Sequence, residues 1–337
     1  MEKSNTNNAE KKPGNPLLHR LRGIIIVEAD YNWVLRLIWG KRLFRHAARY
    51  GNLMTAQQAR PGFQSISAAL NKVLAYDLMR LTKRSGASFD NDAEGCYDRI
   101  VPPHALLCCR RMGLPKTCAA MLTKVLNSTI YKLKTGHGIS ARHYMSNQLR
   151  RILGTGQGSG ASPCIWTLVL DTILWSVALK HSCFQITSPL GAKTHRVGDA
   201  FVDDTSIFLL LPPHQDMVRY SWQDLADKIA IIAQDFERKL YSTGGNLSLS
   251  KCFWYLIDWV WDDDGTAKMR KINQGKAVVS LTQGKFSNTH IIKREEIDTA
   301  IRTIGVRVNP MGNHQIEYEH RLQYTTKWTN LIKKPLN

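Results

Sequence analysis

The sequence predicts an α+β fold, in which a small antiparallel sheet is backed by helices. A β-branched run at residues 24–27 precedes apolar residues at helical spacing over residues 32–49, which indicates a strand followed by a helix. The helical spacing returns over residues 65–81. Residues 200–211 predict a β-hairpin, because two short apolar strands flank an Asp-Asp turn and a pair of prolines closes the second strand.

The remaining elements follow from the spacing of apolar residues, which is helical in some segments and alternating in others, and from turn residues. Prolines at first-turn positions begin two of the expected helices, and Gly113 separates them. Helices are expected at residues 102–112, 115–126, 162–180 and 224–241, and strands at residues 130–135 and 253–261. Residues 1–16 are polar and show neither period, so they are expected to form a disordered tail.

The charge of the chain favours a polyanionic partner. Its 337 residues are enough for one large domain or two modest ones, each with its own core. Lys and Arg number 46 against 27 Asp and Glu, which gives a net charge of +19. Such an excess attracts nucleic acid or anionic lipid. Composition alone does not choose between these partners, and a basic but merely solvated surface is the alternative.

The cysteines and the apolar segments bear on the compartment. The seven cysteines are odd in number and lack paired zinc-type spacing, so reduced intracellular thiols are expected. No secretory signal is present. The most apolar stretch, residues 164–179, is too short to span a bilayer and contains Asp171, which favours a buried helix and no membrane partner. The basic clusters are too short to distinguish nucleus from cytoplasm.

Three short segments contain the candidate chemistry, namely residues 89–98, 156–163 and 201–204. Asp92 ends a predicted strand, and the Asp203-Asp204 pair lies at the predicted hairpin tip. Carboxylates on rigid elements are the ligands that hard divalent cations take, and nucleotidyl transfer uses two such ions about 4 Å apart. An isolated Asp-Asp pair is more typical of a solvated turn. The apolar strands on each side and the two companion segments favour a site.

The three segments resemble the catalytic motifs of reverse transcriptases. D-x-x-x-x-Y-D at residues 92–98 is similar to motif A, Q-G-x-x-x-S-P at residues 157–163 to motif B, and F-x-D-D at residues 201–204 to motif C. The order and the gaps agree as well. Weaker similarity extends over residues 17–308. Residues 22–25, 42–43 and 58–63 are similar to the fingers of non-LTR retroelement and group II intron enzymes, although Gly23 stands where these enzymes usually have Pro. Residues 244–251 are similar to motif D, and residues 303–306 to motif E.

The resemblance implies a right-hand polymerase palm with mostly helical fingers and a truncated thumb. The palm would be the antiparallel sheet backed by helices. At most 27 residues follow Pro310, so the resemblance does not imply processive copying. The implied domains are the tail at 1–16, fingers at 17–89, palm at 90–265 with a helical fingers insertion at about 101–150, a motif E-like palm edge at 266–310, and the start of the thumb at 311–337.

The resemblance also implies catalytic roles. Asp92 and Asp203 would be the main ligands of two Mg²⁺ ions, with Mn²⁺ as the alternative metal, and Asp204 would complete the acidic cluster. Lys251 would protonate the departing pyrophosphate, although a lysine in a loop is more often a solvated charge.

Other matching positions would bind the incoming nucleotide. Arg22 would grip the triphosphate, and the backbone at Gly95 and Cys96 would pass beneath it. Gln157 and Gly158 would lie against the nascent base pair, because glycine lets the backbone approach and glutamine can hydrogen-bond.

Tyr97 falls where the family places an aromatic ring against the 2′ carbon of the sugar. A ring there would clash with a 2′-hydroxyl, so the resemblance implies deoxynucleotide substrates; a core tyrosine is the alternative. Two further acids flank the motif without being expected ligands. Asp90 is expected at a loop or strand edge, and Asp98 in structural hydrogen bonding.

The implied function is that of an RNA-directed DNA polymerase core. It would add deoxynucleotides to a primer 3′-hydroxyl on an RNA template, with an RNA–DNA duplex as product; its oligomeric state is not predicted. An endonuclease or RNase H module has no room, so the chain is expected to be a core, a fragment or a decayed copy. A catalytically silent nucleic-acid-binding remnant and a maturase-like cofactor, which needs a basic surface outside the polymerase cleft, are the alternatives.

Overall fold

The computed structural model describes residues 3–10, 21–135, 138–146, 153–188, 190–212, 221–284 and 288–332. Contacts divide the chain into two compact units. The first unit comprises Met1–Pro61, Ala93–Ser176 and Glu237–Asn246, and the second comprises Gly62–Asp92, Val177–Phe236 and Leu247–Asn337.

A six-stranded sheet forms the centre of the second unit. Its strand order is β14-β15-β11-β3-β10-β9, and β3 pairs antiparallel with both β10 and β11. Only the short β11–β15 ladder in this sheet is parallel among the described strands. The strands are β3 (Gly86–Asp92), β9 (Gly198–Phe201), β10 (Asp204–Leu210), β11 (Phe253–Ile257), β14 (Val279–Thr282) and β15 (Thr289–Arg294).

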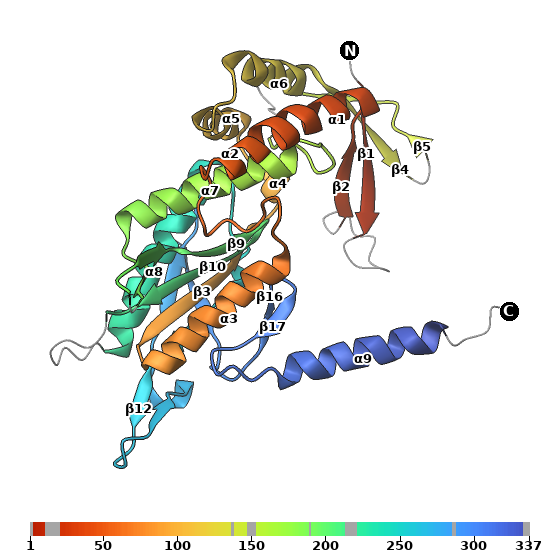
Figure 1. Ribbon diagram of the computed structural model, residues 1–337. Helices are drawn as coiled ribbons and strands as arrows, with labels where there is room; N and C mark the ends of the chain where they lie inside the picture. Colours follow the sequence, from red (N-terminus) through yellow and green to blue (C-terminus); the bar gives the residue numbers. More distant parts are fainter. Residues whose placement is uncertain are drawn as a thin grey trace. The chain divides into compact units, whose positions relative to one another are not determined.

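Helices lie on both faces of this sheet. Helix α3 (Ser65–Thr82) crosses one face, and α8 (Trp222–Ser242) runs behind the other (Figure 1). Tyr76 of α3 is fully buried and meets the ring of Phe208 edge-on, with centroids 6.1 Å apart. Burying such rings removes a large apolar area from water and holds the helix on the sheet.

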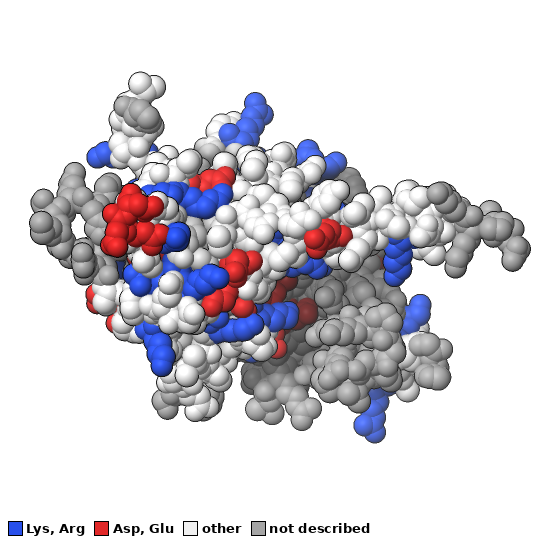
Figure 2. Space-filling view, turned by 90° about the horizontal axis from the view of Figure 1, so that it is seen from below, with Lys and Arg blue, Asp and Glu red and all other residues white. Residues whose placement is uncertain are grey.

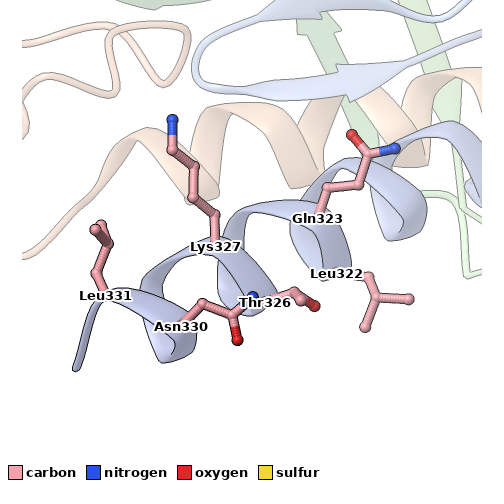
Figure 3. A pocket seen from close by; sticks show the side chains of 6 residues that line it. All are labelled: Leu322, Gln323, Thr326, Lys327, Asn330 and Leu331. Carbon is pink, nitrogen blue, oxygen red and sulfur yellow. The ribbon is translucent and has the colours of Figure 1, made fainter. Parts of the chain in front are cut away.

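The second unit also contains short hairpins and a C-terminal helix. The hairpins are β7–β8 (Phe184–Thr187, Lys193–Arg196), β12–β13 (Trp259–Trp261, Ala267–Met269) and β16–β17 (Ile301–Thr303, Val306–Val308), with 3₁₀ turns η3 (Leu249–Lys251) and η4 (Ile272–Gln274). Helix α9 (Gln315–Ile332) buries none of its residues. Side chains of α9 line an open hollow of about 590 Å³ (Figure 3). The assignment of α9 to a thumb stays a prediction.

The first unit combines a small sheet with helices. Strand β1 joins β2 and β4, and β4 also pairs with β5 and β6. The strands are β1 (Lys3–Glu10), β2 (Leu21–Ile26), β4 (Ile130–Thr135), β5 (Gly138–Ile139) and β6 (Tyr144–Met145). The helices are α1 (Ala29–Leu35), the π-helical η2 (Arg36–Phe44), α2 (Arg45–Arg49), α4 (Cys96–Arg99), α5 (Pro102–Arg111), α6 (Lys116–Ser128) and most of α7 (Ser162–Lys180).

Most elements predicted from apolar periodicity are confirmed. The predicted helix over residues 32–49 is a continuous run of α1, η2 and α2, and the predicted strand over 253–261 breaks at Asp258 into β11 and β12. The prediction of a disordered tail is wrong for β1, whose pairing uses backbone groups that side-chain periodicity does not reveal. Residues 11–16 lie outside the described residues. All seven cysteines are free.

The predicted domain boundaries do not coincide with the two units. Residues 17–89 were predicted as fingers, yet α3 shares the second unit with the palm-like sheet. The names fingers, palm and thumb therefore stay predictions.

Helix α7 is long and apolar enough to cross a membrane by length and composition, and 61% of its apolar window is buried inside the protein. Its predicted burial is confirmed: Asp171 is 1% exposed and accepts a 2.8 Å hydrogen bond from the Met54 amide.

The position predicted for Asp90 is wrong. Asp90 lies in the middle of the sheet, on β3 between β10 and β11, and is 2% exposed. Its Oδ1 atom is 2.5 Å from the ammonium of Lys72, which is 1% exposed and also lies 3.2 Å from the Thr303 hydroxyl. The Ser206 hydroxyl donates to the same Oδ1. A buried carboxylate needs a counter-charge, and α3 supplies it through Lys72.

Lys72→Met should lower the free energy of unfolding by about 3–5 kcal/mol, because it leaves the Asp90 carboxylate buried without its cation. Adding Asp90→Asn removes that charge, so the double variant should lose less than the sum of the two single variants. Urea unfolding of the four proteins measures this coupling. Additive losses would show that the two side chains do not depend on each other.

Candidate active site

The acidic cluster is built by the pairing of two central strands in the second unit. Asp92 is the last residue of β3 and lies directly opposite Asp204, the first residue of β10. Paired residues of antiparallel strands project from the same face, so these two side chains share a face of the sheet. Asp203 precedes Asp204 in the tight β9–β10 turn, where Val202 has a φ of 59°. A β-branched residue in that region is strained, as is common at functional sites.

Like charges meet in this cluster. Burial, together with the neighbouring charges of Asp203 and Asp92, raises the pKa of Asp204 to about 6. A backbone hydrogen bond from Ile304, in the β16–β17 turn, opposes this shift. The carboxylates are therefore held together against their mutual repulsion.

Lys251 forms an ion pair with the cluster. Its Nζ atom lies 2.6 Å from Oδ2 of Asp92, and its pKa is raised, mainly by that hydrogen bond. The preceding loop is tied to the strand, because the Ser248 amide donates to the Asp92 carbonyl at 2.9 Å. The side chain of Lys251 remains 65% exposed, so it can leave Asp92 without disturbing the core.

The donor set suits a hard divalent cation, because all three acids offer carboxylate oxygens. As the side chains stand, the described residues contain no group of three His, Cys, Asp or Glu side chains that could hold a metal ion. Lys251 is bound to one of the required oxygens. Metal binding thus requires the Lys251 ammonium to release Asp92 and the carboxylates to turn toward one ion.

The predicted nucleotide-binding residues cluster separately, in the first unit. Gly95 adopts a left-handed φ of 59° and begins the one-turn helix α4, which contains the buried Cys96 and the half-buried Tyr97. The Tyr97 carbonyl accepts hydrogen bonds from the amides of Thr155 at 2.8 Å and Gly156 at 3.3 Å. Helix α4 is thereby joined to the glycine-rich loop before α7.

That glycine-rich loop is held on its other side by β2. The Gln157 carbonyl accepts a 2.7 Å hydrogen bond from the Ile25 amide, and the Gln157 amide donates to Asp98 Oδ1 at 3.2 Å. The predicted structural hydrogen bonding of Asp98 is confirmed. Gly158 has a φ of 113°, and a Cβ there would overlap the Ile25 carbonyl. Only glycine permits this close approach.

The structure thus groups the predicted residues in two sets. Asp92, Asp203, Asp204 and Lys251 lie in the second unit, and Gly95, Cys96, Tyr97, Gln157 and Gly158 lie in the first. Arg22 lies on β2 of the first unit, opposite Ala9. The side chain of Arg22 is outside the described part of the chain.

Sequence reasoning missed the polar layer beside the acidic cluster. Asp90 and Ser206 are each two residues from a cluster acid along their strands, so they share its face, and Asp199 of β9 pairs with Ser206. Burial raises the pKa of Asp199 to about 6, while Arg196 acts in the opposite direction. The period-two alternation of β3 and β10 was the signal that could have revealed Asp90 and Ser206.

Comparisons with known proteins bear on the fold. Neither a family model nor a curated protein sequence matches the chain. Among solved structures, apo telomerase from Candida tropicalis, truncated from its C-terminal domain, matches with a TM-score of 0.50 and 10% identity over 91% of this chain and 53% of that one. Telomerase from Candida albicans, in complex with a fragment of telomeric RNA, matches with a TM-score of 0.51 and 10% identity over 92% of this chain and 44% of that one.

The chain therefore shares its fold with these telomerases, an α+β structure with a mainly antiparallel sheet backed by helices. The chain spans about half the length of the telomerases that it matches.

Asp204→Asn should stabilise the metal-free protein more at pH 7.5 than at pH 4.5. The raised pKa of Asp204 means that the native state binds its proton more tightly, so its contribution to stability falls as pH rises from about 4 to about 6. Asparagine removes this loss. Urea unfolding in chelator at both pH values measures the difference, and Asp263→Asn, an exposed acid, is the matched control. An equal gain at both values would show that Asp204 is not repelled in the cluster.

Proposed function

We propose that this chain is the core of an RNA-directed DNA polymerase. The observation that carries the proposal is the register that places Asp92 opposite Asp204, with Asp203 in the adjoining turn, on the central strands of a reverse-transcriptase-like fold. The proposed partners are an RNA template, a DNA primer or RNA–DNA duplex, and deoxynucleoside triphosphates. The telomerase neighbour bound to telomeric RNA supports a nucleic-acid partner.

In this proposal Asp92, Asp203 and Asp204 hold the metal, with Asp92 and Asp203 as the main ligands. Two Mg²⁺ ions, or Mn²⁺, would supply activation of the primer hydroxyl and stabilisation of the leaving pyrophosphate. Lys251 neutralises Asp92 in the metal-free protein. Once released, its ammonium is a proton donor for the leaving group, as the motif D resemblance implies.

The nucleotide roles rest on the motif matches and on the hydrogen bonds that join these segments within the first unit. Gly95 and Cys96 present backbone beneath the triphosphate, and Gln157 with Gly158 forms a fixed loop for the nascent base pair. Tyr97 restricts the sugar, and Arg22 grips the phosphates. The hydrogen bonds that join α4, β2 and the loop support pre-organisation of this surface.

A retroelement of the non-LTR type is the proposed origin, because the finger-like residues resemble those of non-LTR retroelement and group II intron enzymes. A maturase-like role in binding structured RNA is the second candidate. It is favoured by a basic cavity on η2 and α2 of the first unit, whose lining includes no residue of motifs A to C.

Asp203→Asn should abolish primer extension by the purified protein on a primed RNA template with deoxynucleotides and Mg²⁺, because a neutral amide replaces a charged metal ligand. A loss of about a hundredfold or more is expected for removing charge stabilisation of this kind. The control Asp263→Asn should extend like the unsubstituted chain. Equal extension by Asp203→Asn, or no extension by any of the proteins, contradicts the proposed function.

Tyr97→Val should admit ribonucleotides, because the smaller side chain leaves room for a 2′-hydroxyl. The measurement is the ratio of kcat/KM for a deoxynucleotide and its ribonucleotide in single-nucleotide extension. Tyr97→Phe keeps the ring and should keep the discrimination. If the ratio is unchanged in Tyr97→Val, the ring is not the steric barrier.

A further inference from the structure

A basic cavity of about 670 Å³ opens on the helical run η2–α2 of the first unit. Four of its lining residues are cations, at spacings that return to one side of a helix. The lining comprises Lys41, Arg42, Arg45, His46, Ala48, Arg49, Tyr50 and Pro61. No acid lines it, so its formal charge is +4 with His46 neutral.

These four cations are held out toward solvent. Lys41, Arg42, Arg45 and Arg49 are all exposed, and none of them forms an ion pair with a described residue. Elsewhere the charge is mixed: on the face seen in Figure 2, basic and acidic side chains lie side by side. Unpaired cations gathered without acids repel one another, a cost that an anionic ligand would remove.

An aromatic platform lies in the same cavity. The rings of His46 and Tyr50 have centroids 4.4 Å apart and planes 36° apart, and Tyr50 is 64% exposed. Exposed rings beside a cationic groove are the combination that binds single-stranded nucleic acid, because phosphates pair with the cations while unpaired bases stack on the rings.

We propose that the η2–α2 cavity binds the phosphate backbone of single-stranded RNA, with one unpaired base stacked on Tyr50. RNA as the ligand rests on the proposed function, whereas binding itself needs neither metal nor nucleotide. A lipid surface fits less well, because membrane-surface helices place large apolar side chains beside their cations, and the uncharged lining here is Ala48 and Pro61 besides the two rings.

The charge component is tested by fluorescence anisotropy with a labelled RNA of roughly 12 nucleotides, without Mg²⁺ or deoxynucleotides. Arg45→Gln with Arg49→Gln should weaken binding about tenfold. Each phosphate contact to a single strand contributes about 0.7 to the slope of log K against log salt, so the slope should fall by about 1.4. Lys116→Gln with Lys124→Gln removes two exposed charges from α6 of the same unit and is the matched control.

The stacking component is tested by Tyr50→Ala, which should weaken RNA binding about tenfold, equivalent to ~1.4 kcal/mol, without changing the salt slope. Tyr50→Phe keeps a ring and should bind like the unsubstituted chain. Circular dichroism of every variant confirms that the helices are intact.

Several results would overturn the proposal. The first is an equal loss of RNA affinity in the arginine variant and in the α6 control. The second is tighter binding of single-stranded DNA than of RNA of the same sequence. The third is an arginine variant that loses binding to phosphatidylserine vesicles while its RNA binding is unchanged. Asp203→Asn separates the two claims, because its RNA binding should still depend on Arg45 and Arg49. RNA binding that depends on the arginines, without primer extension, would support the RNA-binding cavity and contradict the polymerase proposal. Primer extension without arginine-dependent RNA binding would contradict only the cavity proposal.

Discussion

The register between β3 and β10 is the constraint on which the acidic cluster depends. It places Asp92 opposite Asp204 and, two residues along the ladder, Asp90 opposite Ser206. A slip of one residue would turn one strand's polar residues to the other face of the sheet. The apolar residues that alternate with them, such as Phe89 and Ile207, are fully buried. Burial of these apolar side chains therefore fixes the strand register, and the register fixes the positions of the polar side chains on the opposite face.

Holding acids together in this way has an electrostatic cost, which two lysines offset differently. Lys72 is buried and bound to Asp90, so its role is structural and permanent. Lys251 is exposed and bound to Asp92, so it can exchange with another cation. The same sheet face thus combines a fixed ion pair in the core with a replaceable one at the strand end. Desolvation makes the first costly to break, and solvent makes the second easy to break.

The sequence predicted the parts of the structure that local patterns determine. Helix α3 and strand β4 follow from apolar spacing within the segments, and the hairpin at Asp203-Asp204 follows from its flanking strands. Asp90 was misplaced because its central position depends on pairing with β11, more than 150 residues away in the chain. Lys72 was not singled out, since a lysine on an amphipathic helix normally faces solvent. Strand β1 has no side-chain pattern at all.

The acidic cluster and the basic cavity act in opposite directions on a nucleic acid. Without metal, the charged acids around Asp204 repel phosphate. Attraction in the metal-free protein must therefore come from cationic surfaces, of which the η2–α2 cavity has four cations free of ion pairs with described residues. In the proposed function, metal ions would reverse the sign of the acidic cluster, whereas the cavity would need no such change. In that function, RNA would therefore be held before the cluster binds metal.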